Sequence, residues 1–432
     1  LGRIFHDMNE QILNAGSDFS SHMLLFNQKL MYKAGFFFEN RNRAFSARNL
    51  GYKIAKTSLF DWDLPYETVE NVFCNDNINA TDGIMLDEQT SPSDSYTSQS
   101  AQLAGYFTVT VPIGSRVKIH TGIRAERSLV SLDSYKADAT NPPSVEDEIH
   151  YLSDTVLFLP AVNISFSLTE KSLMRLAYGQ TVNRPEYREI APMSFYDYEM
   201  KAVITGNDSL TFATIHNFDL RYEFYPDAFS MFSLGAFHKQ FINAIEYQII
   251  PTGSGLQYSF QNTPEASVSG LEAEMRLTAA SLKGFDFLRN FTVIFNAAVI
   301  KSRICFNENS LEKDRALQGQ SPFILNASLF YQNDSLGLNA GLMYNVVGKR
   351  ISFVGDPFTG NPHIYEMPAN QLDLSLSKKV GNRIELKAQV RNLLNNNTEY
   401  RQTIETENGT VSQTTMQYKP GRYYLLGLAW KI

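Results

Sequence analysis

The stretch RVKIHTGIRAER, residues 116–127, alternates between two kinds of side chain. In a β-strand, successive side chains point to opposite faces of the sheet. One face would carry Val117, Ile119, Thr121, Ile123 and Ala125, and the other Arg116, Lys118, His120, Gly122, Arg124 and Glu126. In a soluble sheet the apolar face covers a core and the charged face meets water. In a membrane barrel the apolar face meets lipid and the charged face lines the lumen.

The same alternation recurs further along the chain, at 217–224, 268–277 and 383–391. In the first of these runs Phe218, Leu220, Tyr222 and Phe224 alternate with Asn217, Asp219, Arg221 and Glu223. Most such runs exceed the length of about 5–6 residues that is usual for soluble strands. Their length favours strands that cross a membrane.

Short and long connections alternate between these runs. Short links rich in turn residues lie at 112–115, 169–172, 225–228, 332–335 and 379–382. Long polar segments lie at 44–98, 132–155, 183–214, 303–321, 347–368 and 392–416. Outer-membrane barrels have short turns at one end and long loops at the other, whereas soluble sandwiches do not follow this rule. The link 278–290 is longer than its place predicts.

Composition is compatible with a membrane barrel. Charged residues make up 19% of the chain, below the roughly 25% of soluble domains, and aromatic residues make up 12%. No apolar run reaches the length of about 18 residues that a transmembrane helix needs, but barrel strands need only about 9–11. No basic region followed by an apolar stretch is present, so no signal peptide is visible.

The formal charge of −7 is unevenly placed. Nine carboxylates and no Lys or Arg occur between Thr57 and Ser115. A nucleic-acid partner is excluded, because it would require a basic stripe. This acidic segment could attract cationic solutes or metal complexes, or bind Ca²⁺; the plainer interpretation is a solvated loop. Cys74 and Cys305 could form one bridge or remain two thiols.

We expect an all-β fold, a transmembrane antiparallel up-and-down β-barrel. About 14 strands can be counted from Leu30 to the final run at 422–432, which places Tyr424, Leu426, Leu428, Trp430 and Ile432 on one face. Residues 1–22 are expected to be a lead-in segment, and 23–432 the barrel portion with its long extracellular loops. The side chains expected to face the lumen are Arg116, Lys118, Arg124, Glu126, Asp219 and Arg221.

Five motifs in order resemble TonB-dependent outer-membrane receptors, in the branch with a carboxypeptidase-regulatory-like N-terminal domain. They are TVNRPEYREIAPMSFYDY (181–198), LRYEFYP (220–226), RALQGQSPFILNASLFYQ (315–332), GKRI (348–351) and YKPGRYYLLGLAW (418–430). The resemblance implies a barrel of about 22 strands, a plug inside it and a box that engages the energy-transducing complex. The strands counted here would be the last 14, and no plug is readable in this chain. A complete 14-stranded barrel is the other interpretation.

Ligand contact is expected at the start of the long segment 183–214. The candidates are Arg184, Glu186, Arg188, Phe195, Tyr196 and Tyr198. Arg forks can bind carboxylates or phosphates, and aromatic faces can stack on a ring of the ligand. A salt-bridge lattice that braces the loop, or aromatic packing, explains the same residues. In QGQSPF (318–323), Gln318, Gln320 and Ser321 could bind a ligand or the plug, or the segment could simply bend the chain.

The function implied is active import of a specific solute, namely an iron chelate, cofactor, peptide or glycan. Partners would be the lipid of the bacterial outer membrane, a TonB-type complex, an unknown small solute and, by family analogy, a surface lipoprotein. A passive porin-like channel and a structural subunit of a larger complex are the alternatives. No metal site, cofactor or catalytic motif is expected, because no HExxH, GxSxG or P-loop occurs.

Overall fold

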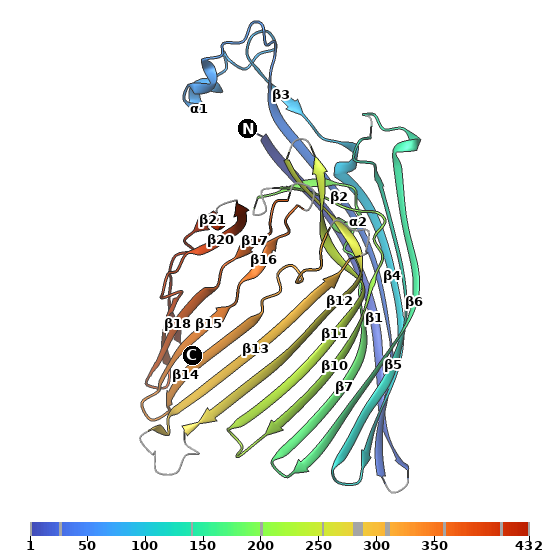
Figure 1. Cartoon of the computed structure of the whole chain (residues 1–432), viewed down its shortest axis with the longest axis vertical. Helices are drawn as coiled ribbons and strands as arrows, with labels where there is room; N and C mark the ends of the chain where they lie inside the picture. The colour runs from blue at the N-terminus through green and yellow to red at the C-terminus, as the bar shows by residue number, and fades with distance from the viewer. Residues whose placement is uncertain are drawn as a thin grey trace.

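The structure is a computed structural model that describes residues 2–25, 28–139, 141–198, 202–252, 255–279, 288–306, 312–356, 360–406 and 409–430. Its main feature is one curved antiparallel wall of long strands (Figure 1). Fourteen pairings join 15 strands of the described residues in sequence order along this wall. The strands are β1 (Gly2–Leu25), β2 (Gln28–Ile54), β4 (Ser95–Ile113), β5 (Val117–Tyr135), β6 (Glu148–Thr169), β7 (Ser172–Asn183), β10 (Ala213–Phe224), β11 (Met231–Thr252), β12 (Gly255–Thr278), β13 (Phe291–Cys305), β14 (Phe323–Asn333), β15 (Leu338–Val347), β18 (Ala369–Val380), β19 (Ile384–Arg391) and β22 (Tyr423–Trp430).

The strand count of 14 and the lead-in at residues 1–22 are corrected by β1. This strand pairs with β2 along its whole length, from Gly2 opposite Gly51 to Leu25 opposite Gln28. Its signal in the sequence is weak because Asp7, Asn9 and Gln11 occupy the positions where alternation would place apolar side chains. A strand segment that stands beyond the lipid needs no apolar face, so period-two patterning fades there.

The alternation predicted for the other strands is confirmed. On one face of the wall, large apolar side chains are exposed, among them Leu103, Phe107, Ile123, Phe158 and Leu426, the last at 88%. A soluble fold would bury such a band, whereas a lipid-facing surface leaves it open on an isolated chain. The convex face of the wall is therefore the lipid-facing side.

The connections also follow the predicted rule. Tight turns join β4 to β5, β6 to β7, β10 to β11, β14 to β15 and β18 to β19 at one end, and the long connections lie at the other (Figure 1). The unexpectedly long link at 278–290 includes residues 280–287, which lie outside the described residues.

Smaller elements occupy the long-connection end. They are β3 (Ile84–Glu88), α1 (Val69–Val72), α2 (Tyr187–Ile190), β8 (Ser194–Asp197), β9 (Ala202–Thr205), and a second sheet of β16 (Arg350–Phe353), β17 (Ile364–Glu366), β20 (Thr398–Thr406) and β21 (Gly409–Tyr418). Single 3-10 turns lie at Leu64–Tyr66, Pro92–Asp94 and Val145–Asp147. Among the described residues, no helix has the length and apolar character to cross a membrane. Cys74 and Cys305 are both free thiols.

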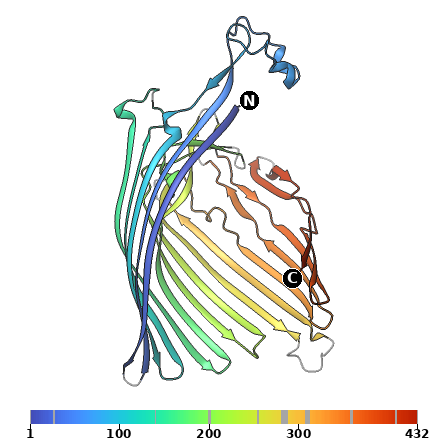
Figure 2. The same cartoon turned by 180° about the vertical axis from the view of Figure 1, so that it is seen from behind.

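The wall has two free edges in the part of the chain that is described. There β1 pairs only with β2, and β22 pairs only with β19. Figure 2 shows these two ends of the wall, blue and red, on opposite sides of the concave interior. The wall is thus an open arc of a barrel.

Candidate functional site

The concave face of the wall carries five of the six charged side chains predicted for the lumen. Lys118 of β5 shares one row with Ser165, Arg175 and Arg221 on the three strands that follow in the wall. Because the side-chain period is two, Arg124 and Glu126 lie on the same face as Lys118, and Asp219 lies on the same face as Arg221.

Arg116, also predicted to face the lumen, lies in the turn before β5 and belongs to no strand face. The remaining charged side chains of this prediction lie on the face that the alternation assigned to the interior.

Two carboxylates organise this inner face. Glu126 is buried between Arg124, at 2.8 Å, and Arg184, at 2.6 Å. Glu223 is likewise buried between Arg175 and Arg221, each at 3.1 Å. Charge-assisted bonds of this kind tie neighbouring strands and the loop to one another on the water-facing side.

The described residues 184–198 and 202–212 of the next loop contact several strands at the long-connection end of the wall. Arg184 reaches β5 through Glu126, and the Tyr151 hydroxyl of β6 donates to the Leu210 carbonyl at 3.1 Å. Glu186 and Glu189 form a reciprocal cap at the start of α2. Arg188 lies over the Phe195 ring at 3.4 Å from its centre. The predicted residues Arg184, Glu186, Arg188 and Phe195 thus contact other residues of this chain.

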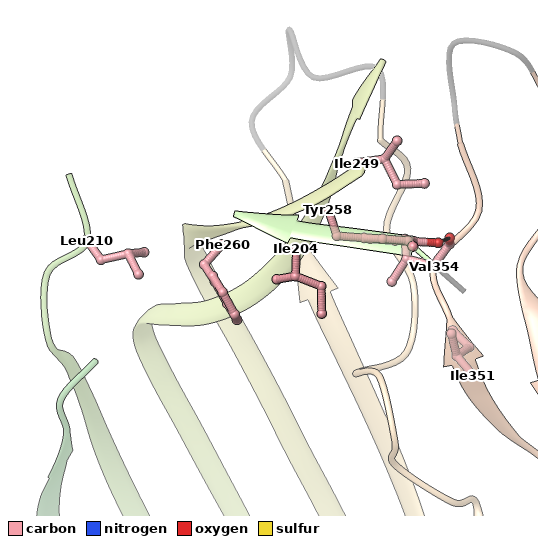
Figure 3. Close-up of a cluster of buried hydrophobic side chains, with 8 residues drawn as sticks. Ile204, Leu210, Ile249, Tyr258, Phe260, Ile351 and Val354 are labelled. Carbon is pink, nitrogen blue, oxygen red and sulfur yellow. Dashed lines mark hydrogen bonds between the residues drawn. The ribbon is translucent and has the colours of Figure 1, made fainter. Parts of the chain in front are cut away.

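Two apolar clusters hold this loop from both sides. Ile190, Ala191 and Met193 pack with Tyr96 and Leu132 of the β4–β5 wall. Ala202, Ile204 and Leu210 pack with residues of β11, β12 and the β16 region: Ile249, Tyr258, Phe260, Ile351 and Val354 (Figure 3). The loop therefore joins the β4–β5 part of the arc to β11, β12 and β16 at the long-connection end, which we call the mouth. We call the described residues 184–198 and 202–212 the strut.

One face of the strut remains open. Tyr196 and Tyr198 are exposed, the latter at 78%, and their rings meet edge to face with centres 5.1 Å apart. Strand pairing places Tyr196 on the face opposite to Phe195 and Ile204. On the Tyr196 side, Thr205 bonds both Ser194 at 2.7 Å and Gln257 at 2.9 Å. The open face thus combines aromatic rings with hydroxyl and amide groups.

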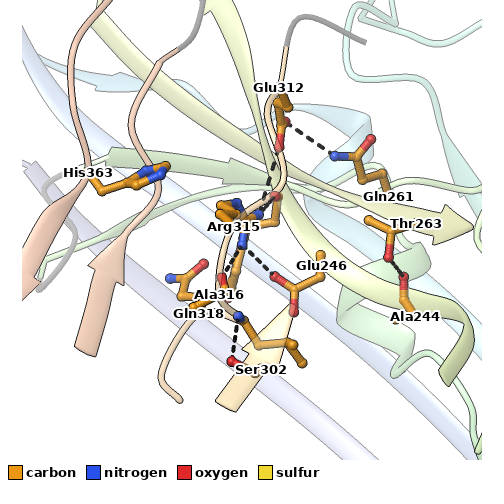
Figure 4. A network of polar contacts seen from close by, with 12 residues as sticks. Ala244, Glu246, Gln261, Thr263, Ser302, Glu312, Arg315, Ala316, Gln318 and His363 are labelled. Carbon is orange, nitrogen blue, oxygen red and sulfur yellow. Dashed lines mark hydrogen bonds and ion pairs between the residues drawn. The ribbon is translucent and has the colours of Figure 1, made fainter. Parts of the chain in front are cut away.

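A second polar centre, around Arg315, lies beside the apolar cluster that contains Ile204 and Leu210, and was missed by the sequence analysis (Figure 4). The Arg315 guanidinium is almost fully buried, with Glu246 at 3.3 Å and Glu312 at 3.8 Å. It also donates to the Ala316 and Tyr247 carbonyls. The sequence analysis included Arg315 only as the first residue of the motif at 315–332 and gave it no role, because a lone Arg gives no signal of its distant carboxylate partners.

The QGQSPF segment binds backbone of this chain. Gln318 donates to the Ser352 carbonyl at 2.6 Å, and Ser321 donates to the Phe323 and Gly348 carbonyls. Gly319 has a φ of +75°, a conformation that glycine adopts without strain. These contacts and the φ of Gly319 support the interpretation of this segment as a bend in the chain.

A cavity of about 510 Å³ lies beside Arg315, lined among others by Glu312, Asp356, His363 and Tyr365. Burial lowers the pKa of His363, and the charge of Arg315 lowers it further. Burial raises the pKa of Glu312, although Arg315 opposes this effect. No group of three or more metal-ligating side chains occurs in the described part of the chain.

The sequence profile of a family described as "TonB dependent receptor-like, beta-barrel" matches residues 6–393. No curated protein matches the sequence.

Several solved structures share the fold at low identity. They include the ferric yersiniabactin uptake receptor FyuA from Yersinia pestis (14% identity, TM-score 0.59, 98% of this chain and 54% of that one), the ferric-catecholate import receptor Fiu from E. coli K12 (14%, 0.63, 98% and 55%) and the siderophore receptor PiuA from Acinetobacter baumannii (12%, 0.64, 98% and 56%). The chain spans about half the length of these structures.

Proposed function

Since the chain belongs to the TonB-dependent receptor family and supplies β-barrel wall, we propose that it is part of an outer-membrane importer for a specific solute. The observation that carries the proposal is the division of the wall into two faces. The outer face is apolar and exposed, and the inner face is laced by buried ion pairs such as Arg184–Glu126. Such a wall separates lipid from an aqueous passage.

The two free edges support a larger barrel in the native protein. In lipid, an unpaired backbone N–H or C=O costs several kcal/mol, so open sheet edges do not occur there. We propose that further strands join β1 to β22, and that the strands described here are the later part of a barrel of about 22. A plug inside this barrel would be remodelled by a TonB-type complex to let the solute pass.

Within the mouth, the proposed ligand surface is the open face of the strut. Tyr196 and Tyr198 offer ring faces for stacking, and Ser194, Thr205 and Gln257 offer hydrogen bonds beside them. Arg184, Glu186 and Arg188 would act indirectly, because their charged groups already bind this chain. Their role would be to hold the two tyrosines in place.

Ferric chelates are the first ligand class to test, because the structures that share this fold are receptors for ferric yersiniabactin, ferric catecholates and siderophores. The experiment measures accumulation of radioactive iron, supplied as a panel of ferric siderophores, by cells with and without the full-length protein. A protonophore added to half of each sample removes the energy that a TonB-type complex would use.

An importer predicts accumulation that needs the protein and stops with the protonophore. Replacing both Tyr196 and Tyr198 with Ala should raise the half-saturating concentration about tenfold, equivalent to about 1.4 kcal/mol. Arg48→Ala, on the outer face, is the matched control and should leave accumulation unchanged. Protein-dependent entry that persists with the protonophore, together with ion conductance in a planar bilayer, would instead identify a passive channel.

A further inference from the structure

The segment of residues 55–86 stands out beyond the long-connection end of β2 as a separate arm (Figure 1). Its base is closed by the Ala55 N–H, which donates to the Gly83 carbonyl at 3.0 Å. Below the base, Arg48 forms two bonds of 2.9 Å with Glu88, and Lys53 bonds Asp87 at 2.7 Å. These cations neutralise Glu88 and Asp87 at the foot of the arm, and Lys56, next to the base, is the one Lys or Arg within residues 55–86.

The arm has a defined local structure. Phe60 is buried against Trp62, and Phe73 packs against Tyr52 of β2 with ring centres 4.7 Å apart. The Asn79 side chain accepts hydrogen bonds from the backbone N–H groups of three residues that follow it in the chain. Other apolar side chains of the arm remain exposed, and Trp62, although it contacts Phe60, is exposed as well.

Those outward side chains are large. Tyr66 is 90% exposed and Trp62 59%, and Leu59, Val69 and Ile78 are exposed as well. The arm lies beyond the lipid-facing band, so lipid cannot cover these side chains. Several large apolar side chains exposed on one short segment outside the membrane are typical of a surface where another molecule docks. Trp and Tyr are the residues that protein interfaces favour.

The charge of the arm selects the kind of partner. From Thr57 to the end of the arm there is no Lys or Arg. Six exposed carboxylates take part in none of the ion pairs of the described residues: Asp61, Asp63, Glu67, Glu70, Asp76 and Asp82. A second copy of this arm would be repelled by like charge, whereas a basic surface would be attracted.

We propose that the arm is a docking site for a partner protein that presents Lys and Arg side chains around an apolar pocket. Trp62 and Tyr66 fill the pocket, and the carboxylates around them pair with the basic rim. This function lies beyond solute import, because the arm is separate from the strut and from the Arg315 centre.

The test places a photo-crosslinking amino acid at position 66 of the full-length protein in living cells. Mass spectrometry then identifies the crosslinked peptide. The matched control carries the same probe at Val145, which is 81% exposed in another long connection. A third sample adds Asp61→Asn, Asp63→Asn, Glu67→Gln and Glu70→Gln to the position-66 probe.

The proposal predicts that the probe at position 66 crosslinks to a peptide of one other protein, and that this peptide is rich in Lys and Arg. The probe at position 145 should not crosslink to that protein. The yield of the crosslink at position 66 should fall about tenfold in the neutralised arm. In isolated outer membranes carrying the unmodified arm, high salt should lower the yield in the same way, which separates charge from misfolding of the variant. Crosslinking to lipopolysaccharide, to the same polypeptide or to nothing would overturn the proposal, as would a yield insensitive to both charge and salt.

Discussion

Single carboxylates shared by two guanidinium groups recur on the inner face. Glu126 joins Arg124 to Arg184, and Glu223 joins Arg175 to Arg221. The sequence predicted that Glu126, Arg124 and Arg221 face inward, because a period of two needs no knowledge of partners. It could not predict which groups pair, because the partners lie on different strands and on the strut.

Arg315→Met should destabilise the structure around the Arg315 centre. The substitution leaves the buried carboxylates of Glu246 and Glu312 without their cation, a loss of about 3–5 kcal/mol for a buried pair. We expect faster hydrogen exchange in residues 312–323 and 360–366, measured on the full-length protein in detergent. Arg303→Ala is the control, since its pair with Asp314 is exposed and its loss should leave exchange unchanged. Equal protection in Arg315→Met and the native protein would contradict this account.

His363 should make the same region sensitive to acid. Its Nδ1 accepts a hydrogen bond from the Gly355 N–H at 2.7 Å, and burial lowers its pKa below the usual 6.5. The folded loop therefore favours the neutral ring. The contribution of His363 to the stability of the loop is fully present above the ordinary pKa of about 6.5. It is lost as the pH falls from there toward the lowered pKa of the folded state. Hydrogen exchange of residues 360–366, corrected for its intrinsic pH dependence, should accelerate between pH of about 7.5 and about 5.5.

Glu312 acts in the opposite direction. Because its pKa is raised above 4.5, its contribution to stability is present below that value and is lost as the pH rises through the raised pKa. His363→Gln separates the two effects, since an amide oxygen can still accept from Gly355 but does not titrate. A native acid response that persists unchanged in this variant would exclude His363 as its source.

At the scale of elements, the strut decides the shape of the mouth. Leu210→Ala should lower the stability of the strut by about 2–5 kcal/mol, because truncating a nearly inaccessible Leu leaves a cavity. Exchange of the backbone amides in β8 and β9 should increase accordingly. Tyr198→Ala is matched to it as an exposed residue of the same loop, and should change the stability by less than about 0.5 kcal/mol. Unchanged protection in Leu210→Ala would show that the strut is not held by this cluster.

Elements differed in how far sequence predicted them. The strands β5, β10 and β22 were readable because lipid and water impose opposite demands on their two faces. β1 was missed because much of it lacks an apolar face, although it pairs with β2 over its full length. The strut was located but not its fold, because Ile190 and Ile204 find their partners on strands far away in the sequence.

For the whole molecule, the central claim is that the wall has a lipid face and a water face. The sequence carried this claim through alternation, connection lengths and motifs in order. It did not carry the exact strand count, the strut contacts or the Arg315 centre, because these depend on packing between distant segments. The two free edges of the arc add a structural expectation to the importer proposal. Because a lipid-facing sheet cannot leave its edge strands unpaired, further strands should close the barrel between β1 and β22.

The measurement that tests this claim most directly is a nitroxide scan of residues 117–126 in the full-length protein in its membrane, after Cys74 and Cys305 are replaced with Ser. Collision with oxygen, which concentrates in lipid, is compared with collision with a water-soluble nickel complex. The account predicts that the odd-numbered positions favour oxygen and the even-numbered positions favour nickel, with a period of two. The reversed pattern, or no alternation, would contradict it.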